Sequence, residues 1–130
     1  MFFELRQYRI FPGKMAEWVK FMEETIIPRQ VAKGFVIVGS FVGQEEDDLY
    51  VWIRRFASEE ERAALQRAFY DTAEWRDELR PIAQTMNDFS RIVVAHRGDA
   101  EIGDPLAPCG APGTSRKRSS QWPRKTYWCW

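Results

Sequence analysis

The chain has 130 residues, of which 19 are Lys or Arg and 19 are Asp or Glu, so its formal net charge is zero at pH 7. A balanced charge creates no overall field that would favour nucleic acid, an anionic membrane or an acidic substrate. A chain of this length forms one domain with a modest core. Its apolar runs are short and its first residues carry charges. We therefore expect neither a membrane span nor a signal peptide, and we predict a cytoplasmic protein.

The chain divides into two unequal parts. Apolar residues recur periodically from Phe2 to about Arg97, and from Gly98 onward prolines alternate with glycines, followed by basic and aromatic residues. Such a segment buries too little apolar surface to offset the entropy cost of ordering it. We predict a domain over residues 1–97 and a mobile extension over residues 98–130. Both cysteines fall in the extension, where they form neither a disulfide framework nor a metal motif.

The periodic part predicts strand, helix, strand, strand, helix, strand. Proline should divide both helical segments, at Pro28 and Pro81, because it lacks the amide hydrogen that a helix needs. Gly34 should end the first helix, and Ser58 with Glu61 forms a capping box that should begin the second. The predicted strands cover residues 2–11, 35–42, 49–56 and 89–97.

The third strand has two unlike faces, because alternation separates aromatic from aliphatic side chains. A row of aromatic side chains around a guanidinium is typical of a strand that lines a pocket on that side. We interpret the aliphatic face as ordinary core. The aromatic face holds Tyr50, Trp52, Arg54 and Phe56, and the aliphatic face holds Leu49, Val51 and Ile53.

This order of elements predicts an α+β protein with a ferredoxin-like βαββαβ sheet, antiparallel, with helices on one face. The second strand is apolar on both sides, so the face without helices also needs a cover. Four strands about 4.8 Å apart, with eight residues of about 3.3 Å each, present roughly 500 Å². That area is near the largest apolar patch that a soluble monomer exposes. A second copy is the simplest cover, and we predict a homodimer.

Several short motifs resemble the NIPSNAP family of the dimeric α/β-barrel superfamily. They are ELRQY at 4–8, PGK at 12–14, SEEER at 58–62, and the single residues Asp71, Trp75 and Pro81. The resemblance covers residues 2–97 and implies a homodimeric barrel of two ferredoxin-like sheets around a central cavity. The extension and the acidic turn at 44–48 lie outside it. Relatives in the wider superfamily include cofactor-free monooxygenases, lactone isomerases and haem-handling enzymes, so the resemblance implies no single reaction.

Polar residues on the first strand suggest a binding site. Glu4, Arg6 and Tyr8 share one face and would meet Trp52 and Arg54 of the neighbouring strand. A carboxylate, a guanidinium and a phenol among aromatic walls could orient an oxygenated small molecule. The alternative is an internal ion pair, Glu4 with Arg6 or Arg54, that satisfies its own charges. The predicted ligand-binding residues are Arg6, Tyr8, Tyr50, Trp52 and Arg54.

Glu4 and His96, the single histidine, are the candidate general bases. Neither has a neighbouring ligand set, and we predict no metal or cofactor. Asn87, the single asparagine, should end a helix. No nucleophile elbow, glycine-rich phosphate loop or His/Cys metal cluster supports a hydrolase, kinase or metalloenzyme. Three functions stay open: a small-molecule binder, a cofactor-free monooxygenase or isomerase, and an interaction protein whose tail contacts nucleic acid or a membrane.

Overall fold

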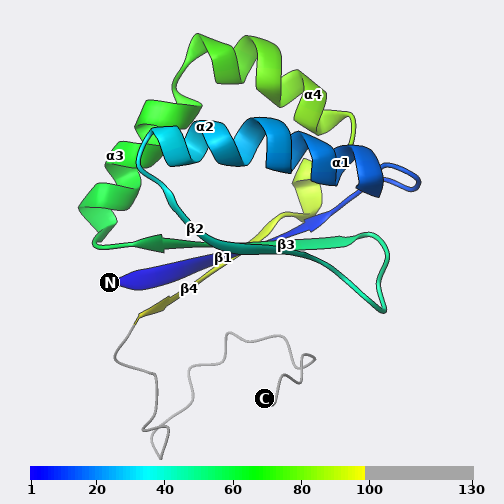
Figure 1. The fold of residues 1–130 in the computed structure, drawn as a ribbon, viewed down its shortest axis with the longest axis horizontal. Helices are drawn as coiled ribbons and strands as arrows, with labels where there is room; N and C mark the ends of the chain where they lie inside the picture. The colour runs from blue at the N-terminus through cyan, green and yellow to red at the C-terminus, as the bar shows by residue number, and fades with distance from the viewer. Residues whose placement is uncertain (99–130) are drawn as a thin grey trace, which may run out of the picture.

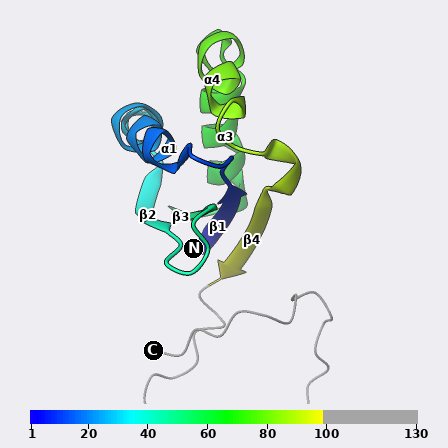
Figure 2. The same cartoon turned by 90° about the vertical axis from the view of Figure 1, so that its right-hand side faces the viewer.

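The computed structural model describes residues 1–98, which form a four-stranded antiparallel sheet with helices over one face (Figures 1 and 2). The strand order is β2-β3-β1-β4, so two crossovers place β1 and β3 at the centre. This confirms the predicted ferredoxin-like α+β fold. The extension predicted after Arg97 lies outside the described residues apart from Gly98, and so does its expected contact with nucleic acid or a membrane. The strands are β1 (Phe2–Arg9), β2 (Val36–Val42), β3 (Leu49–Phe56) and β4 (Val93–Gly98).

Two helical segments cover the sheet, and each contains a widened, π-helical turn two residues before a proline. The N–H of Ile27 bonds to the carbonyl five residues back, and the N–H of Arg80 does the same. A proline ring crowds the carbonyl four residues before it, which a wider turn relieves. The predicted interruptions at Pro28 and Pro81 are confirmed. The segments are α1 (Met15–Phe21), η1 (Met22–Ile26) and α2 (Ile27–Ala32), then α3 (Glu59–Tyr70), η2 (Glu74–Leu79) and α4 (Arg80–Gln84).

The predicted helix boundaries at Gly34 and Ser58 are also confirmed. The Oγ of Ser58 accepts a hydrogen bond of 3.1 Å from the amide of Glu61, as in a capping box. Gly34 follows α2 with φ of +103°, a conformation that favours glycine. Among residues 1–98, no helix combines the length and the apolar content that a bilayer crossing requires.

The last strand begins later than predicted. A 3₁₀ turn, η3 (Phe89–Arg91), takes up the start of the predicted strand, and β4 begins at Val93. The carboxylate of Asp88 accepts hydrogen bonds from the amide (3.1 Å) and the hydroxyl (2.6 Å) of Ser90. This local turn competes with an extended backbone and displaces the strand.

The two faces of β3 are the reverse of the sequence interpretation. Trp52, Arg54 and Phe56 are buried on the face that the helices cover. Val51 and Ile53 instead lie on the face of the sheet that carries no helices, the open face. These aliphatic side chains are therefore not the core beneath the helices. Long aromatic side chains fill the deep space between a sheet and its helices, whereas short β-branched side chains leave a flatter surface.

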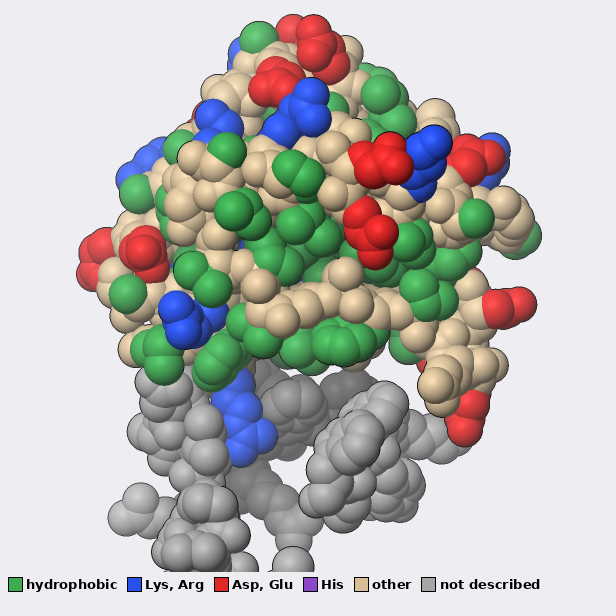
Figure 3. Space-filling model, in the orientation of Figure 1, with side chains coloured by type: hydrophobic (Ala, Val, Ile, Leu, Met, Phe, Trp, Pro, Cys, Tyr) green, Lys and Arg blue, Asp and Glu red, His purple; other side chains and the backbone are tan. Residues whose placement is uncertain are grey.

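An irregularity in β2 also changes one predicted face. Pairing with β3 shifts between Ile37 and Gly39, and the alternation shifts with it. Phe41 therefore lies with Val36 on the open face, whereas strict alternation along β2 would place it with Ile37. The Phe41 ring lies over Gly39, where a Cβ atom would come within 2.9 Å of it. Hydrophobic side chains consequently gather below the sheet as well as above it (Figure 3).

Candidate ligand-binding site

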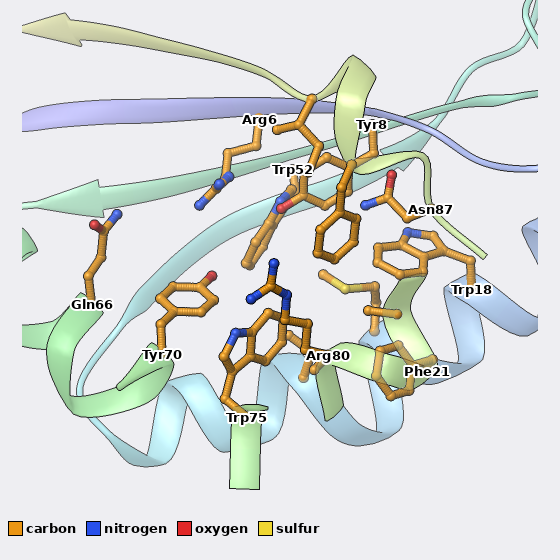
Figure 4. Close-up of a pocket in the computed structure, with 15 residues that line it drawn as sticks. Arg6, Tyr8, Trp18, Phe21, Trp52, Gln66, Tyr70, Trp75, Arg80 and Asn87 are labelled. Carbon is orange, nitrogen blue, oxygen red and sulfur yellow. The ribbon is translucent and has the colours of Figure 1, made fainter. Parts of the chain in front are cut away.

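A cavity of about 300 Å³ lies between the helix-covered face of the sheet and the two helical segments (Figure 4). Arg6 and Tyr8 of β1 and Trp52 of β3 line the sheet side, and Trp18 of α1 and Trp75 of η2 line the helix side. Its volume is at the lower end of the roughly 300–1,000 Å³ found for ligand pockets, so it suits a small ligand. The other lining residues are Phe21, Met22, Ile26, Gln66, Tyr70, Arg80, Ala83, Asn87, Phe89 and Ile92.

Aromatic rings form most of the cavity wall and hold one another in place. Tyr8 meets Trp18 edge to face, with centroids 5.7 Å apart and planes at 79°. Tyr70 and Trp75 pack in the same way at 4.9 Å and 86°. Such contacts restrict the side chains before any ligand arrives. A preformed aromatic cavity reduces the ordering cost of binding.

Several polar atoms around the cavity have no hydrogen-bond partner in residues 1–98. They are Nε of Arg6, Nε1 of Trp18, Nε1 of Trp52 and Oδ1 of Asn87. The only other buried side-chain atom of this kind in the described part of the chain is the Tyr50 hydroxyl. Each such atom costs about 1–3 kcal/mol when it is left unpaired. Four of the five such atoms in the described residues therefore belong to residues that line one cavity.

Tyr8 contributes a neutral hydroxyl to the cavity. Burial raises the pKa of this phenol to about 12, although the nearby charge of Arg6 lowers it. The phenol therefore keeps its proton at neutral pH and can donate a hydrogen bond. The indole N–H of Trp52 lies near this hydroxyl but outside hydrogen-bond geometry.

Among residues 1–98, the side chains that line the cavity include two guanidinium groups and no carboxylate. Arg6 reaches it from the sheet, and Arg80 reaches it from the start of α4 (Figure 4). In residues 1–98, Arg80 makes no ion pair. The lining therefore carries an excess of positive charge.

A buried charge cluster lies beside the cavity. Glu4 and Arg54 have 0% relative exposure, and Arg54 donates from Nε (3.1 Å) and from Nη2 to the same carboxylate oxygen. Nε2 of His96 lies 3.0 Å from the other oxygen of Glu4. Arg54 also donates from Nη1 to the side-chain oxygen of Gln30 at 3.1 Å. The internal ion pair considered from the sequence is present.

The cluster keeps Glu4 ionised. Burial alone would raise the pKa of its carboxyl group, but the charge and hydrogen bonds of Arg54, together with His96, hold this pKa below its ordinary value of 4.5. A carboxylate with a lowered pKa is a weak base. Its chemistry at neutral pH is electrostatic: it compensates the buried guanidinium.

Three of the predicted ligand-binding residues line the cavity: Arg6, Tyr8 and Trp52. Tyr50 and Arg54 do not, because they lie in the core around it. The cavity lies under the helices of a single chain, not on the open sheet face where a two-sheet barrel would enclose it. The expectation that Arg6, Tyr8 and Trp52 point into a cavity on the open face is wrong, because the sequence interpretation assigned the faces of β3 in reverse.

The candidate bases do not line the cavity either. Glu4 is enclosed by its partners, and the side chain of His96 is 44% exposed on β4. A catalytic role for either stays a prediction. Among residues 1–98, His, Cys, Asp and Glu side chains do not come together in groups of three that could hold a metal ion.

Sequence reasoning missed the other lining residues, among them Trp18, Trp75, Arg80 and Asn87. The spacing of Trp18 and Trp75 fits the apolar faces of their helices and so indicates core positions, and Arg80 carries no local signal. Asn87 follows α4 as predicted, but its backbone also forms an isolated bridge with Ile10, which fixes the side chain at the cavity. The one available signal was the indole N–H of each tryptophan, which needs a partner when it is buried.

The antiparallel sheet with two crossovers, and the cavity beneath its helices, define a ferredoxin-like α+β protein with a candidate small-molecule site. The chain belongs to the NIPSNAP family, whose model matches residues 3–95. No curated protein matches the chain.

Solved structures share the fold at low sequence identity. A protein from Agrobacterium tumefaciens is 24% identical with a TM-score of 0.68, over 82% of this chain and 100% of its own. A NIPSNAP family protein from the same species is 23% identical with a TM-score of 0.67, over 82% of this chain and 98% of its own. An antibiotic biosynthesis monooxygenase is 15% identical with a TM-score of 0.56, over 75% of this chain and 97% of its own.

Proposed function

We propose that this NIPSNAP protein binds a small aromatic molecule in the cavity between its sheet and its helices. The observation that carries the proposal is the set of unpartnered polar atoms around an aromatic cavity of about 300 Å³. Rings of Trp52, Tyr70 and Trp75 offer stacking and edge contacts to a flat ligand. The indole N–H of Trp18 and the amide of Asn87 offer hydrogen bonds to its substituents.

Filling the cavity is expected to abolish binding. Ala83 is 2% exposed and lines the cavity, so an Ala83→Leu variant places extra carbon atoms in the ligand's volume. Overpacking of this kind costs about 1–3 kcal/mol of stability. We expect dissociation constants for a panel of phenol, indole, 4-hydroxybenzoate and 4-hydroxybenzyl alcohol to rise at least about tenfold. Isothermal titration calorimetry measures this directly.

Ala68→Leu is the matched control, because Ala68 is exposed on α3 and does not line the cavity. Circular dichroism establishes that both variants are folded. Native mass spectrometry of the wild-type protein should also reveal any molecule that co-purifies. The proposal is wrong if no panel member binds the wild type at millimolar concentration, or if the Ala83→Leu variant binds as well as the wild type.

A second candidate function is cofactor-free oxygenation or lactone isomerisation. The fold is shared with an antibiotic biosynthesis monooxygenase, although at 15% identity this supports the fold alone. Unpaired N–H donors of Arg6, Trp18 and Trp52 in an aromatic cavity could stabilise an oxyanion on a bound substrate. The described residues place no carboxylate or imidazole in the cavity lining, so the substrate would have to enter already ionised.

Oxygen uptake and lactone consumption separate this enzyme function from binding. If the protein is an enzyme, Trp18→Phe keeps an aromatic ring of smaller size and removes one N–H donor, and we expect the turnover rate to fall about tenfold to a hundredfold. Ligand binding should weaken far less. Binding without any turnover of aerated hydroxy-aromatic or lactone panels would leave the carrier function alone.

We further propose that two copies pack their open sheet faces together around a two-fold axis. Phe41 and Val93 of that face are 56% and 51% exposed in the single chain. An isologous contact covers the apolar surface without a different partner. Light scattering should therefore give a mass of twice 15.3 kDa at micromolar concentration. The apolar residues of this face include Leu5, Phe41, Val51, Ile53 and Val93.

A further inference from the structure

We propose that the ligand of this cavity is an anion, an aromatic carboxylate whose charge is held by Arg6 and Arg80. This inference rests on the proposed binding function and names the chemical class of the ligand. The protein leaves positive charge at this cavity uncompensated.

Arg6 has charge and hydrogen-bonding capacity to spare. Its side chain is 18% exposed, and its nearest carboxylate is Glu4, with 3.6 Å between Nη1 of Arg6 and Oε1. That separation is an ion-pair distance and is too long for a strong hydrogen bond. The two oxygens of Glu4 are already occupied by Arg54 and His96. Nε of Arg6 has no partner in residues 1–98, so the guanidinium can still bind an acceptor.

The whole cluster around Glu4 is positively charged. Arg6, Arg54 and Arg62 lie within ion-pair distance of the Glu4 carboxylate, and Arg62 also pairs with Glu59. Three guanidinium groups against two carboxylates leave one positive charge. Arg54 and Arg62 are each hydrogen-bonded to a carboxylate. Arg6, which lines the cavity, has no such hydrogen-bonded carboxylate.

Arg80 brings a second positive charge to the same cavity. Its guanidinium extends into the cavity from the helix side, and Arg6 extends from the sheet side (Figure 4). Two guanidinium groups directed into one cavity repel each other unless an anion lies with them. A carboxylate matches the planar donor geometry of a guanidinium and can accept two parallel hydrogen bonds from it.

The rest of the lining fits the remainder of such a ligand. The ring of an aromatic acid would lie among Trp52, Tyr70 and Trp75, whose faces and edges accept flat molecules. Trp18 and Asn87 lie toward the other end of the cavity from Arg6 (Figure 4). Their unpaired N–H and amide groups can bind a hydroxyl on the far side of the ring. The shape and charge together correspond to a 4-hydroxy-aromatic acid.

Matched ligands that differ only in charge test the inference. We expect the full-length protein to bind 4-hydroxybenzoate at least about tenfold more tightly than 4-hydroxybenzamide in calorimetry, because the two have similar size and shape. Arg6→Met should reduce this preference to about twofold or less, and Arg80→Met should reduce it at least about threefold. Arg76→Met is the control, because Arg76 is exposed on η2 and does not line the cavity, and it should keep the wild-type preference.

The outcomes separate this inference from the binding function on which it rests. If the neutral amide binds the wild type as tightly as the acid, the anion inference is overturned and the binding function stands. If neither ligand nor any aromatic panel member binds, both are overturned. A charge preference that persists in Arg6→Met and Arg80→Met would also overturn the inference. Arg80 is exposed, so Arg80→Met should fold. This variant still tests the inference if Arg6→Met does not fold.

Discussion

Replacing Glu4 with Gln is expected to lower the free energy of unfolding by about 3–5 kcal/mol, because it leaves the Arg54 guanidinium buried without its counter-charge. Both side chains have 0% relative exposure, so water cannot replace the lost partner. Glutamine has nearly the same shape as glutamate and leaves no cavity. The charge is therefore the property that the substitution tests. Urea unfolding at neutral pH, followed by circular dichroism, measures the change.

The effect of this substitution should also depend on pH in one direction. The folded state holds the pKa of Glu4 below 4.5, so folding favours the ionised carboxyl group. Its contribution to stability is present above the unfolded-state pKa and is lost as the pH falls through the lower, folded-state value. The stability difference between wild type and Glu4→Gln should shrink as the pH falls below about 5.

A surface ion pair provides the comparison. Oε1 of Glu74 lies 2.6 Å from Nε of Arg29, and each side chain is 44% exposed. Glu74→Gln should therefore lower the free energy of unfolding by less than about 1 kcal/mol. A Glu4→Leu/Arg54→Met double variant should be less destabilised than the sum of its two single variants, because it removes both buried charges. Equal losses for Glu4→Gln and Glu74→Gln would show that the buried cluster does not stabilise the fold.

Local chemistry made the order of elements predictable from the sequence. Pro28 and Pro81 cannot complete a regular helix, Gly34 accepts a positive φ, and Ser58 offers its hydroxyl to the first turn of α3. Each of these constraints acts within a few residues. The amino-acid sequence alone therefore reveals these constraints. Their sum fixes the succession of strands and helices, and with it the sheet order.

The side of the sheet that the helices cover could not be predicted in the same way. Alternation along β3 separates Trp52 from Val51, but both faces are apolar enough to be core. The decision comes from side-chain length: the helices pack over Trp52 and Phe56, which fill the deeper space. The irregularity at Gly39 in β2 adds a shift that no hydrophobic pattern contains.

Only some residues of the candidate site could be predicted from the sequence, for a related reason. Arg6, Tyr8 and Trp52 stand out because strand pairing places them together on neighbouring strands. Arg80 and Asn87 reach the same cavity from segments far away in the sequence. Their role depends on how the second helical segment packs over the sheet, and no periodicity in the chain encodes that.

A charge on the open sheet face is expected to separate the proposed dimer. Phe41 of the edge strand β2 pairs with Val51 on that face, and its side chain is 56% exposed. A carboxylate at a dry contact costs at least about 2 kcal/mol, and a two-fold axis introduces it twice. A Phe41→Asp variant should therefore raise the dimer dissociation constant by about a thousandfold. Light scattering should show half the wild-type mass at micromolar concentration.

The control must add the same charge to an equally exposed apolar position away from the sheet. Val31 on α2 is 53% exposed, so Val31→Asp changes net charge and surface hydrophobicity much as Phe41→Asp does. It should leave the mass unchanged. A monomeric wild type, or a dimer that persists in the Phe41→Asp variant, would mean that the open face does not meet a second copy. The cavity lies within one chain, beneath its own helices. Its ligand preference should therefore survive in the Phe41→Asp monomer, which makes the two proposals independent.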